Sequence, residues 1–500
     1  MADTARDAHL PHAVPLQLAA LAHLPDAVAR PAYRRDELRA GIVHFGLGNF
    51  HRAHQAVYLD RLMNAGRALD WAIIGVGTRA PDAAIRTDLA AQDWLYTVVE
   101  QTAERSDARV LGVMNDMIGP GEAERVIDTL ADPAIRIVSL TVTEGGYFLD
   151  GQGRFDPGHR DVAADASGMP GTVFGQIAEG LRRRRAAGVP PFTVMSCDNL
   201  PHNGHVARAV VTGVARLRDA ALADWIEENV AFPNGMVDRI TPATGARELA
   251  AVATEHGIAD RRPVFCEDFI QWVLEDDFPA GRPPLEEAGV EFVDDVTAHE
   301  AMKLRILNGG HAVIAYPSGL MGIEYAHDAM ADPLVAGFLD RLEREEIIPH
   351  VPSIPGTSPT DYYETCARRF ANPKIADTIA RLCFDGSNRQ PKFIVPTIRD
   401  RLAAGLPVTG LALESALWCR YCAGTDEAGD AIAANDPQWD HLQATAHGAR
   451  AEPDAWLAMD AVYGDTGRAE PFRAAFVDAL AALWRDGTRA TLRRYVDGAA

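Results

Sequence analysis

Short apolar runs alternate with amphipathic stretches through the N-terminal part of the chain. The runs that predict strands are Gly41–Phe45, Trp71–Val76, Tyr96–Glu100, Arg136–Val142 and Phe192–Ser196. Helical periodicity lies between several of them, as in Glu122–Leu130. Strands that alternate with helices predict an α/β fold with a parallel, doubly wound sheet.

The pattern changes near Thr297, after which helical periodicity dominates. Examples are Pro333–Ile347, Ile375–Cys383 and Pro471–Trp484. A chain of 500 residues also exceeds what one hydrophobic core usually serves. We therefore expect two domains, an α/β domain over residues 1–295 and a mostly α-helical domain over residues 296–500 that carries substrate and catalytic groups.

Composition excludes several classes of partner. The formal net charge of -22 would repel the nucleic-acid backbone, and no apolar run approaches the roughly 20 residues that span a membrane. Met1–Leu24 lacks the basic start and apolar block of a secretion signal. Six cysteines are too few for a disulfide scaffold in a chain of this length. We expect a cytoplasmic protein, a monomer or weak oligomer, whose partners are small molecules.

One cysteine pair has the spacing of a metal or redox motif. Cys419 and Cys422 lie in Leu413–Cys422, which reads as an amphipathic helix. A second Cys or His pair, which a zinc site would need, does not accompany them. We therefore predict no metal site.

Lysine is almost absent from the chain. Of the 48 basic residues only Lys303, Lys374 and Lys392 are lysines, and the others are arginine. Arginine stays protonated in proteins, whereas a lysine can lose its proton when its surroundings favour the neutral form. A lysine retained against this bias is a candidate for proton transfer, although each of the three could equally have survived by chance.

A glycine turn joins the first predicted strand to a helix predicted over His51–Met63. In dinucleotide-binding folds such a turn lets the backbone approach a pyrophosphate. Gly46 and Gly48 are placed for this, but the third glycine of the usual fingerprint is replaced by His51. After the second strand, Asp82 is the first acidic residue. It could bind the adenosine ribose, which would favour NAD, or it could cap the next helix.

The candidate chemistry lies in a mostly apolar segment between Ala301 and Tyr316 that predicts a buried helix. At about 100° per residue, Asn308 lies roughly 140° and His311 roughly 80° around the axis from Lys303. A neutral Lys303 would accept an alcohol proton, and Asn308 and His311 would donate hydrogen bonds to the oxygen. The alternative is a structural polar network.

Two consecutive glycines, Gly309 and Gly310, follow Asn308. Each weakens a helix by about 1 kcal/mol relative to alanine. Close approach of another group would compensate for this cost, which favours the functional interpretation.

Five motifs in order resemble the long-chain mannitol dehydrogenase family, and the similarity runs through nearly the whole chain. The motifs are His44–Ala53, Thr143–Tyr147, Ser196–Gly204, Val237–Pro242 and the segment with Lys303, Asn308 and His311. The resemblance implies a Rossmann-type NAD-binding domain, a helical C-terminal domain and zinc-independent oxidation of a sugar alcohol to its ketose, D-mannitol to D-fructose. By itself each motif is modest evidence.

The resemblance also implies roles for single residues. Lys303 is implied as the general base, with Asn308 and His311 as oxyanion donors. It adds Asn199 and Asp238 for orientation or proton transfer, Glu300 for proton relay, Arg381 and Arg389 for substrate, and Asn49, Phe50 and Glu144 for the cofactor. Taken alone, Asn199 and Asp238 fit turn and capping roles better. Position 389 is arginine in this chain but often lysine in the family. Because this position is implied to contact substrate, the difference leaves the exact polyol open.

The substrate and the catalytic class remain open in two respects. The substrate could be D-arabinitol, D-sorbitol or a hexuronate such as fructuronate. The chain could also be a non-catalytic NAD-binding sensor. A zinc-dependent dehydrogenase would need a Cys/His/Glu ligand set, and a short-chain dehydrogenase would need a Tyr four residues before a Lys. Neither pattern is found around the three lysines.

Overall fold

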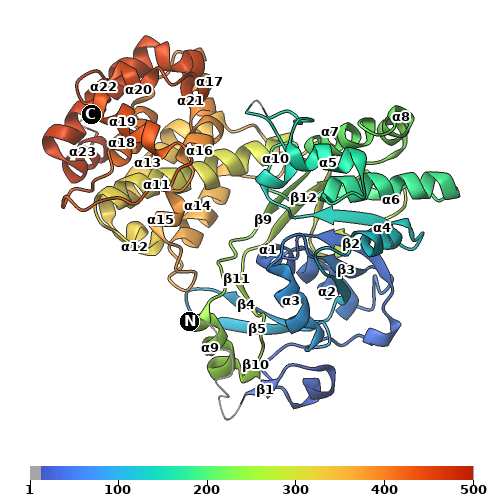
Figure 1. Cartoon of the computed structure of the whole chain (residues 1–500). Coiled ribbons are helices and arrows are strands. Elements are labelled where there is room, and N and C mark those ends of the chain that lie inside the picture. The colour runs from blue at the N-terminus through green and yellow to red at the C-terminus, as the bar shows by residue number, and fades with distance from the viewer. Residues whose placement is uncertain (1–12, 152, 499–500) are drawn as a thin grey trace. The chain divides into compact units, whose positions relative to one another are not determined.

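The chain divides into two compact units, with the division after Thr297 (Figure 1). The computed structural model describes residues 13–151 and 153–498. The first part of Met1–Leu24, on which the expectation about secretion partly rests, lies outside these residues. Each unit is considered by itself.

The first unit is built on a five-stranded parallel sheet. In spatial order its strands are β6 (Met114–Ile118), β3 (Ala72–Val76), β2 (Ala40–Phe45), β7 (Ile137–Leu140) and β8 (Thr193–Ser196). The first strand in chain order is central, with later strands added on either side. This is the doubly wound order of dinucleotide-binding folds, and the order reverses between β2 and β7.

Helices cover both faces of this sheet (Figure 1). They are α1 (Asn49–Ala53), α2 (Gln55–Asn64), α3 (Asp82–Ala90), α4 (Ala123–Ala131), α5 (Arg160–Ser167), α6 (Val173–Ala187), α7 (Asn203–Arg216) and α8 (Ala220–Asn229). Along β2, Ile42 belongs to the core beneath α2, whereas Val43 and Phe45 belong to the core beneath α4, α6 and α7. Because successive strand residues face opposite sides, the apolar run buries both faces.

Smaller sheets complete the first unit. Their strands are β11 (Val264–Glu267), β4 (Tyr96–Gln101) and β5 (Ser106–Leu111) in one sheet, β13 (Glu291–Val293), β12 (Gln271–Glu275) and β9 (Gly235–Asp238) in another, and β1 (Val14–Pro15) with β10 (Ile258–Ala259) in a third. The helix α9 (Ala246–His256) lies between β9 and β10 in the chain. The predicted strand Tyr96–Glu100 therefore exists, but it pairs outside the main sheet.

The second unit is helical. Its helices are α10 (Thr297–Met302), α11 (Gly309–Leu320), α12 (Ala326–Ala331), α13 (Pro333–Leu342), α14 (Pro359–Phe370), α15 (Ile379–Leu382), α16 (Gly386–Phe393), α17 (Val395–Ala403), α18 (Thr409–Cys422), α19 (Trp439–Ala449), α20 (Asp454–Leu457), α21 (Asp460–Tyr463), α22 (Glu470–Asp486) and α23 (Thr488–Val496). Two π-helical turns, η5 (Lys303–Asn308) and η6 (Glu343–Ile347), interrupt the series.

Short 3-10 turns complete the elements. They are η1 (Leu18–His23), η2 (Arg35–Glu37), η3 (Glu144–Tyr147), η4 (Leu285–Ala288), η7 (Ile348–His350) and η8 (Gly464–Arg468).

Helix α18 is the central element of the second unit, and α11, α19 and α22 pack against it. Every residue from Gly410 to Cys422 is buried, including Glu414 and Arg420. The expectation of an amphipathic helix here was wrong, because polar residues on its outer side meet other helices rather than water. The helix predicted over Ile375–Cys383 is also shorter, since only Ile379–Leu382 is α-helical.

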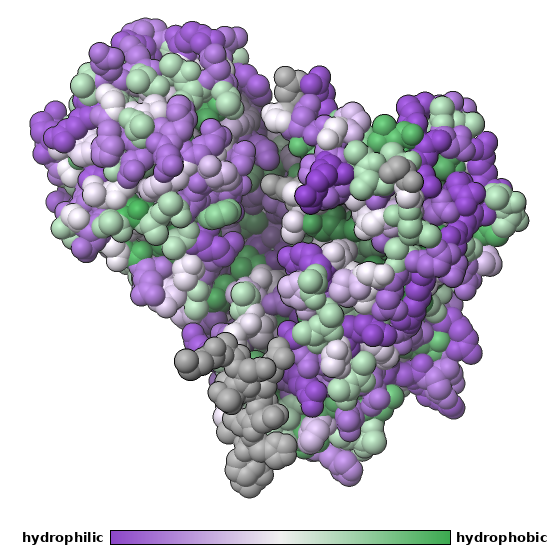
Figure 2. Space-filling model, viewed as in Figure 1, coloured by the Kyte–Doolittle hydropathy of each residue, from purple (hydrophilic) through white to green (hydrophobic). Residues whose placement is uncertain are grey.

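The visible surface of each unit is mainly hydrophilic, with scattered apolar residues (Figure 2). Within the described residues, no helix combines the length and the apolar character that crossing a bilayer requires. All six cysteines are buried.

Candidate active site

The glycine turn after β2 has the backbone shape that a dinucleotide fold requires. Gly46 has a φ of 87°, and a Cβ there would lie 2.0 Å from the carbonyl oxygen of Thr141. Any side chain at this position would collide with the backbone of the residue that follows β7. A Cβ at Gly48 would meet nothing nearer than 3.9 Å. The turn is therefore closed toward the sheet and open at Gly48, where another molecule could approach the backbone.

Asn49 and Phe50 begin the helix that follows the turn. The Asn49 amide donates to the carbonyl oxygen of Pro242 and to Thr244 Oγ1, both at 3.2 Å. The Phe50 ring stacks on His54 with centroids 4.9 Å apart. Asn49 thus joins the turn to the loop after β9. The helix breaks at His54 (φ -117°, ψ -91°), so the predicted helix His51–Met63 is two helices.

Asp82 stabilises the turn after β3. Its Oδ2 accepts hydrogen bonds from the backbone amides of Thr78 and Arg79, both at 2.9 Å. The side chain is buried, and Oδ1 lies 4.0 Å from Arg79 Nη2. The capping role considered from the sequence was wrong, because Asp82 is the first residue of α3 and its carboxylate bonds to the turn before the helix. A bond from Oδ1 to a ribose stays a prediction.

Asp198 connects the loops that leave β7 and β8. Its carboxylate accepts from the amides of Val142 and Thr143 at 3.1 and 2.8 Å and from the Tyr147 hydroxyl at 2.7 Å. This places the backbone of η3, which includes Glu144, beside the loop that carries Asn199. The Glu144 side chain lies outside the described residues. Asn199 itself is exposed. Sequence reasoning missed Asp198, although the quoted motif Ser196–Gly204 contains it.

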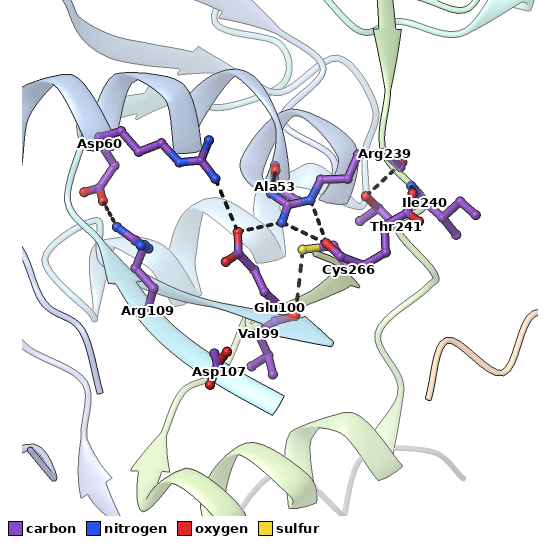
Figure 3. A network of polar contacts seen from close by, with 12 residues as sticks. Ala53, Asp60, Val99, Glu100, Asp107, Arg109, Arg239, Ile240, Thr241 and Cys266 are labelled. Carbon is purple, nitrogen blue, oxygen red and sulfur yellow. Dashed lines mark hydrogen bonds and ion pairs between the residues drawn. The ribbon is translucent and has the colours of Figure 1, made fainter. Parts of the chain in front are cut away.

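Asp238 is buried at the end of β9, and the next residue anchors this strand end (Figure 3). The Arg239 guanidinium donates to the carbonyl oxygens of Ala53 and Glu267 and pairs with Glu100 at 2.6 Å. Ala53 is the last residue of α1, where a free carbonyl and the helix dipole favour a cation. Arg239 therefore couples the strand of Asp238 to the helix of the glycine turn.

The segment with Lys303, Asn308 and His311 is helical but not a continuous α-helix. Lys303–Asn308 forms a π-helical turn, in which the Gly309 amide bonds to the carbonyl oxygen of Leu304, five residues back. Such a turn holds more residues than an α-helical turn, so each residue advances through a smaller angle around the axis. Asn308 therefore lies nearer to the face of Lys303 than the roughly 140° that an α-helix would give.

Basic side chains act electrostatically on the buried His311. Burial lowers its pKa well below the usual value, and Arg381, Arg369, Arg389 and Lys303 lower it further. The ring packs on Phe370 with centroids 4.3 Å apart. His311 is therefore neutral in the working pH range and keeps one ring N–H to donate. These electrostatic couplings group Arg381 and Arg389 with His311, and they add Arg369 of α14, which sequence reasoning missed.

The two substrate candidates differ in their local contacts. Arg381 is exposed and forms a two-point ion pair with Asp377, while Arg389 is half-buried and donates to the carbonyl oxygen of Leu382 at 3.1 Å. Lys303 and Glu300 are both 7% exposed. They lie three residues apart at the junction of α10 and η5.

The paired glycines allow close packing by the protein itself. A Cβ at Gly310 would lie 3.2 Å from Phe370 Cε2 and 3.3 Å from Glu343 Oε1, whereas one at Gly309 would meet nothing nearer than 3.7 Å. The approach expected from the sequence therefore occurs at Gly310. Its partners are an aromatic ring that touches His311 and a buried carboxyl group.

These features fit a bound dinucleotide and show no cluster for a metal. The glycine turn lies at the reversal of strand order, where such folds bind dinucleotides. Across residues 13–151 and 153–498, no three His, Cys, Asp or Glu side chains gather closely enough to hold a metal ion. Burial raises the pKa of the Cys419 and Cys422 thiols well above the usual value, which disfavours the thiolate that metal binding needs.

Comparison with known proteins decides the family. Two family models match the chain. The model of the mannitol dehydrogenase Rossmann domain matches residues 40–287, and the model of the mannitol dehydrogenase C-terminal domain matches residues 295–484. The chain belongs to the mannitol dehydrogenase family. The family resemblance and the predicted fold class are confirmed, and the chain is an oxidoreductase of this family.

Relatives from this family align over most of their length. The chain is 58% identical to mannitol 2-dehydrogenase of Cereibacter sphaeroides, with 94% of this chain and 99% of that protein covered. It is 43% identical to mannitol 2-dehydrogenase of Phaeosphaeria nodorum, with 94% and 83% covered.

Two solved structures have the same architecture at a TM-score of 0.88. Pseudomonas fluorescens mannitol 2-dehydrogenase, in ternary complex with NAD and D-mannitol, is 43% identical, with 97% of this chain and 99% of that chain covered. A D-sorbitol dehydrogenase in substrate-free form is 38% identical, with 95% and 100% covered.

Proposed function

We propose that this mannitol dehydrogenase family member is a metal-independent, NAD-dependent polyol dehydrogenase that oxidises D-mannitol to D-fructose. The observation that carries the proposal is the π-helical turn that brings Asn308 closer to the face of Lys303 and leads into His311. Relatives named mannitol 2-dehydrogenase support the choice of substrate.

Lys303 is the general base. Oxidation of a secondary alcohol requires removal of the hydroxyl proton, and a neutral amine can accept it. Bound NAD supplies the acceptor for the hydride. Arginine could not replace Lys303, because its guanidinium does not lose a proton under these conditions. Glu300, three residues earlier, is the candidate group to pass that proton onward.

Asn308 and His311 stabilise the substrate oxygen. The Asn308 amide and the single N–H of neutral His311 are donors without a positive charge, suited to an oxygen that changes from alkoxide to carbonyl. Arg381 and Arg389 are the candidates to bind the remaining hydroxyl groups. Asn199 and Asp238 stay candidates for orienting substrate or assisting proton transfer.

The first unit binds the cofactor. The backbone of Gly46 and Gly48 receives the pyrophosphate, since Gly48 is open to close approach. Asn49 and Phe50, at the start of the helix that follows, are candidate cofactor contacts. Asp82 and Glu144 are the acidic candidates, and a carboxylate near the ribose favours NAD over NADP.

A substrate panel tests the proposal. NADH absorbance is followed with D-mannitol, D-sorbitol and D-arabinitol at alkaline pH, and with D-fructose and fructuronate at neutral pH. We expect the highest kcat/KM for D-mannitol and D-fructose, with NAD preferred to NADP. Faster reduction of fructuronate than of fructose would contradict the substrate assignment, and absence of any turnover with demonstrable NADH binding would favour a non-catalytic NAD-binding sensor.

D-sorbitol is the second candidate substrate. The match to a solved D-sorbitol dehydrogenase, at the same TM-score as the mannitol enzyme, favours it over D-arabinitol and fructuronate. D-mannitol and D-sorbitol differ in the configuration of one hydroxyl group, which the panel resolves directly. The cytoplasm and a monomeric or weakly oligomeric state remain predictions for cell fractionation and size-exclusion chromatography.

A further inference from the structure

The third glycine of the dinucleotide fingerprint is replaced by a histidine that stacks on another histidine. His51 lies in the first turn of α1, and His44 lies in β2. Their rings are parallel within 16°, with centroids 3.4 Å apart, and both are at most 1% exposed. In the usual fingerprint the third glycine lets the helix pack closely on the strand. Here two flat rings fill that space.

The lower ring is held by the neighbouring strand. His44 Nδ1 hydrogen-bonds to Ser139 Oγ at 2.7 Å, and His44 Nε2 hydrogen-bonds to Thr141 Oγ1 at 2.9 Å. Thr141 Oγ1 also donates to the carbonyl oxygen of Gly46 at 2.6 Å. The orientation of the His44 ring is thus tied to the backbone of the glycine turn itself.

The network beneath the upper ring extends to the helix that follows it. Ser139 Oγ lies 2.9 Å from Gln55 Oε1, so α2, which follows α1 directly, joins the same network. The His51 ring therefore rests on a ring of fixed orientation. The thickness of the rings sets the distance of His51 from β2, and the His44 ring cannot rotate without breaking its hydrogen bonds.

The pair is uncharged. Burial lowers the pKa of His44 to about 3, and burial lowers that of His51 well below the usual value, with His44, Arg52 and His54 acting in the same direction. A neutral pair offers no charge to a pyrophosphate. Spacing, rather than electrostatic attraction, is what this stack can contribute to cofactor binding.

We infer that the His44–His51 stack is a positioning device that sets the height of α1 above β2, and with it the backbone geometry of the Gly46–Gly48 turn that receives the dinucleotide. His51 is a positioning residue in this role. The inference rests on the proposed use of NAD but on no particular polyol.

The test compares variants of His51 in the full-length protein. His51→Gly restores the usual fingerprint, and His51→Phe keeps a flat ring. NADH affinity is measured by fluorescence titration, which requires no turnover, beside KM for NAD and kcat at saturating NAD. We expect His51→Gly to raise the NADH Kd about tenfold, equivalent to roughly 1.4 kcal/mol, with kcat changed little. His51→Phe should stay within about threefold of wild type.

A stability control separates positioning from general weakening. Val194 is fully buried in the edge strand β8, away from the turn, and Val194→Ala should lower Tm without altering NADH affinity. Should His51→Gly not fold, His51→Leu replaces it, with loss of affinity expected because a branched aliphatic group cannot stack as a flat ring.

The inference would be overturned by wild-type NADH affinity in the glycine or leucine variant, or by an equal affinity loss in Val194→Ala. Failure of the wild-type protein to bind NADH would instead contradict the proposed function.

Discussion

The role of single side chains is sharpest at Lys303, the lysine that lies in the π-helical turn. Replacement by methionine keeps much of its length but removes the proton acceptor. We expect kcat to fall about 10³-fold, the usual contribution of a general base, while NADH affinity is retained. Lys392→Met, a change at an exposed lysine of α16, serves as the matched control. Substantial activity in Lys303→Met would eliminate the mechanism.

Asn308 should show a smaller effect of a different kind. Removing one donor to a developing oxyanion costs about 10²-fold in kcat. Asn308→Ala should therefore lower kcat more than it raises KM, which steady-state kinetics with D-fructose measures. A change confined to KM would mean that Asn308 binds substrate without assisting the reaction.

Among the helices, the paired glycines of α11 offer a matched comparison. Gly309 has helical backbone angles and room for a methyl group, so Gly309→Ala should stabilise the protein by up to about 1 kcal/mol. At Gly310 the methyl group would press on Phe370, which packs on His311. Gly310→Ala should therefore lower kcat/KM at least several-fold, since small displacements of reacting groups are costly. Thermal unfolding and kinetics of both variants give the comparison, and equal activity would refute the packing argument.

Helix α18 supplies a prediction for pH. Burial raises the pKa of Glu414 from 4.5 to about 8, and its Oε1 accepts from Gln390. A carboxyl group that holds its proton more tightly when folded costs stability as pH rises from about 4.5 toward 8. Glu414→Gln cannot ionise and keeps the bond to Gln390.

The free energy of unfolding of Glu414→Gln should therefore equal that of the wild type at pH 4.5 and exceed it by on the order of 3 kcal/mol at pH 7. Differences in Tm across this range measure it. A constant difference would show that Glu414 does not titrate as its burial implies.

At the scale of the whole molecule, the described residues hold no cluster of metal-binding side chains. Dialysis of the enzyme against a strong chelator should leave kcat unchanged. Activity that falls and returns with zinc would overturn the metal-independent mechanism. Addition of zinc to an undialysed sample is the control for inhibition.

Comparison of sequence and structure shows which features were accessible from pattern alone. Gly46 and Gly48 were predicted because turn chemistry is local: Gly46 has a positive φ, which glycine adopts most readily, and Gly48 leaves the backbone open. Lys303 was singled out because one residue type is so scarce. The positions of Arg369, Arg239 and Glu343 were not predictable, because each depends on contacts with residues distant in sequence.

The helical segment of Lys303 was predicted in part from the sequence and in part only seen in the structure. Apolar periodicity correctly indicated a buried helix, but it carries no signal for the extra residue in the turn, which changes where Asn308 lies. Periodicity was also insufficient at Leu413–Cys422. Its polar residues suggested a solvent-exposed face, but the whole segment is buried.

By itself the sequence determined the doubly wound sheet, the helical second unit, the glycine turn and the candidate for proton transfer, because these follow from local periodicity, turn chemistry and composition. Only the tertiary structure decided that His51 stacks on His44, that Arg239 holds the end of α1, and that the charges of three arginines act on the buried His311. Such relations arise when distant segments pack together, and their energies depend on burial and distance, which no linear pattern contains.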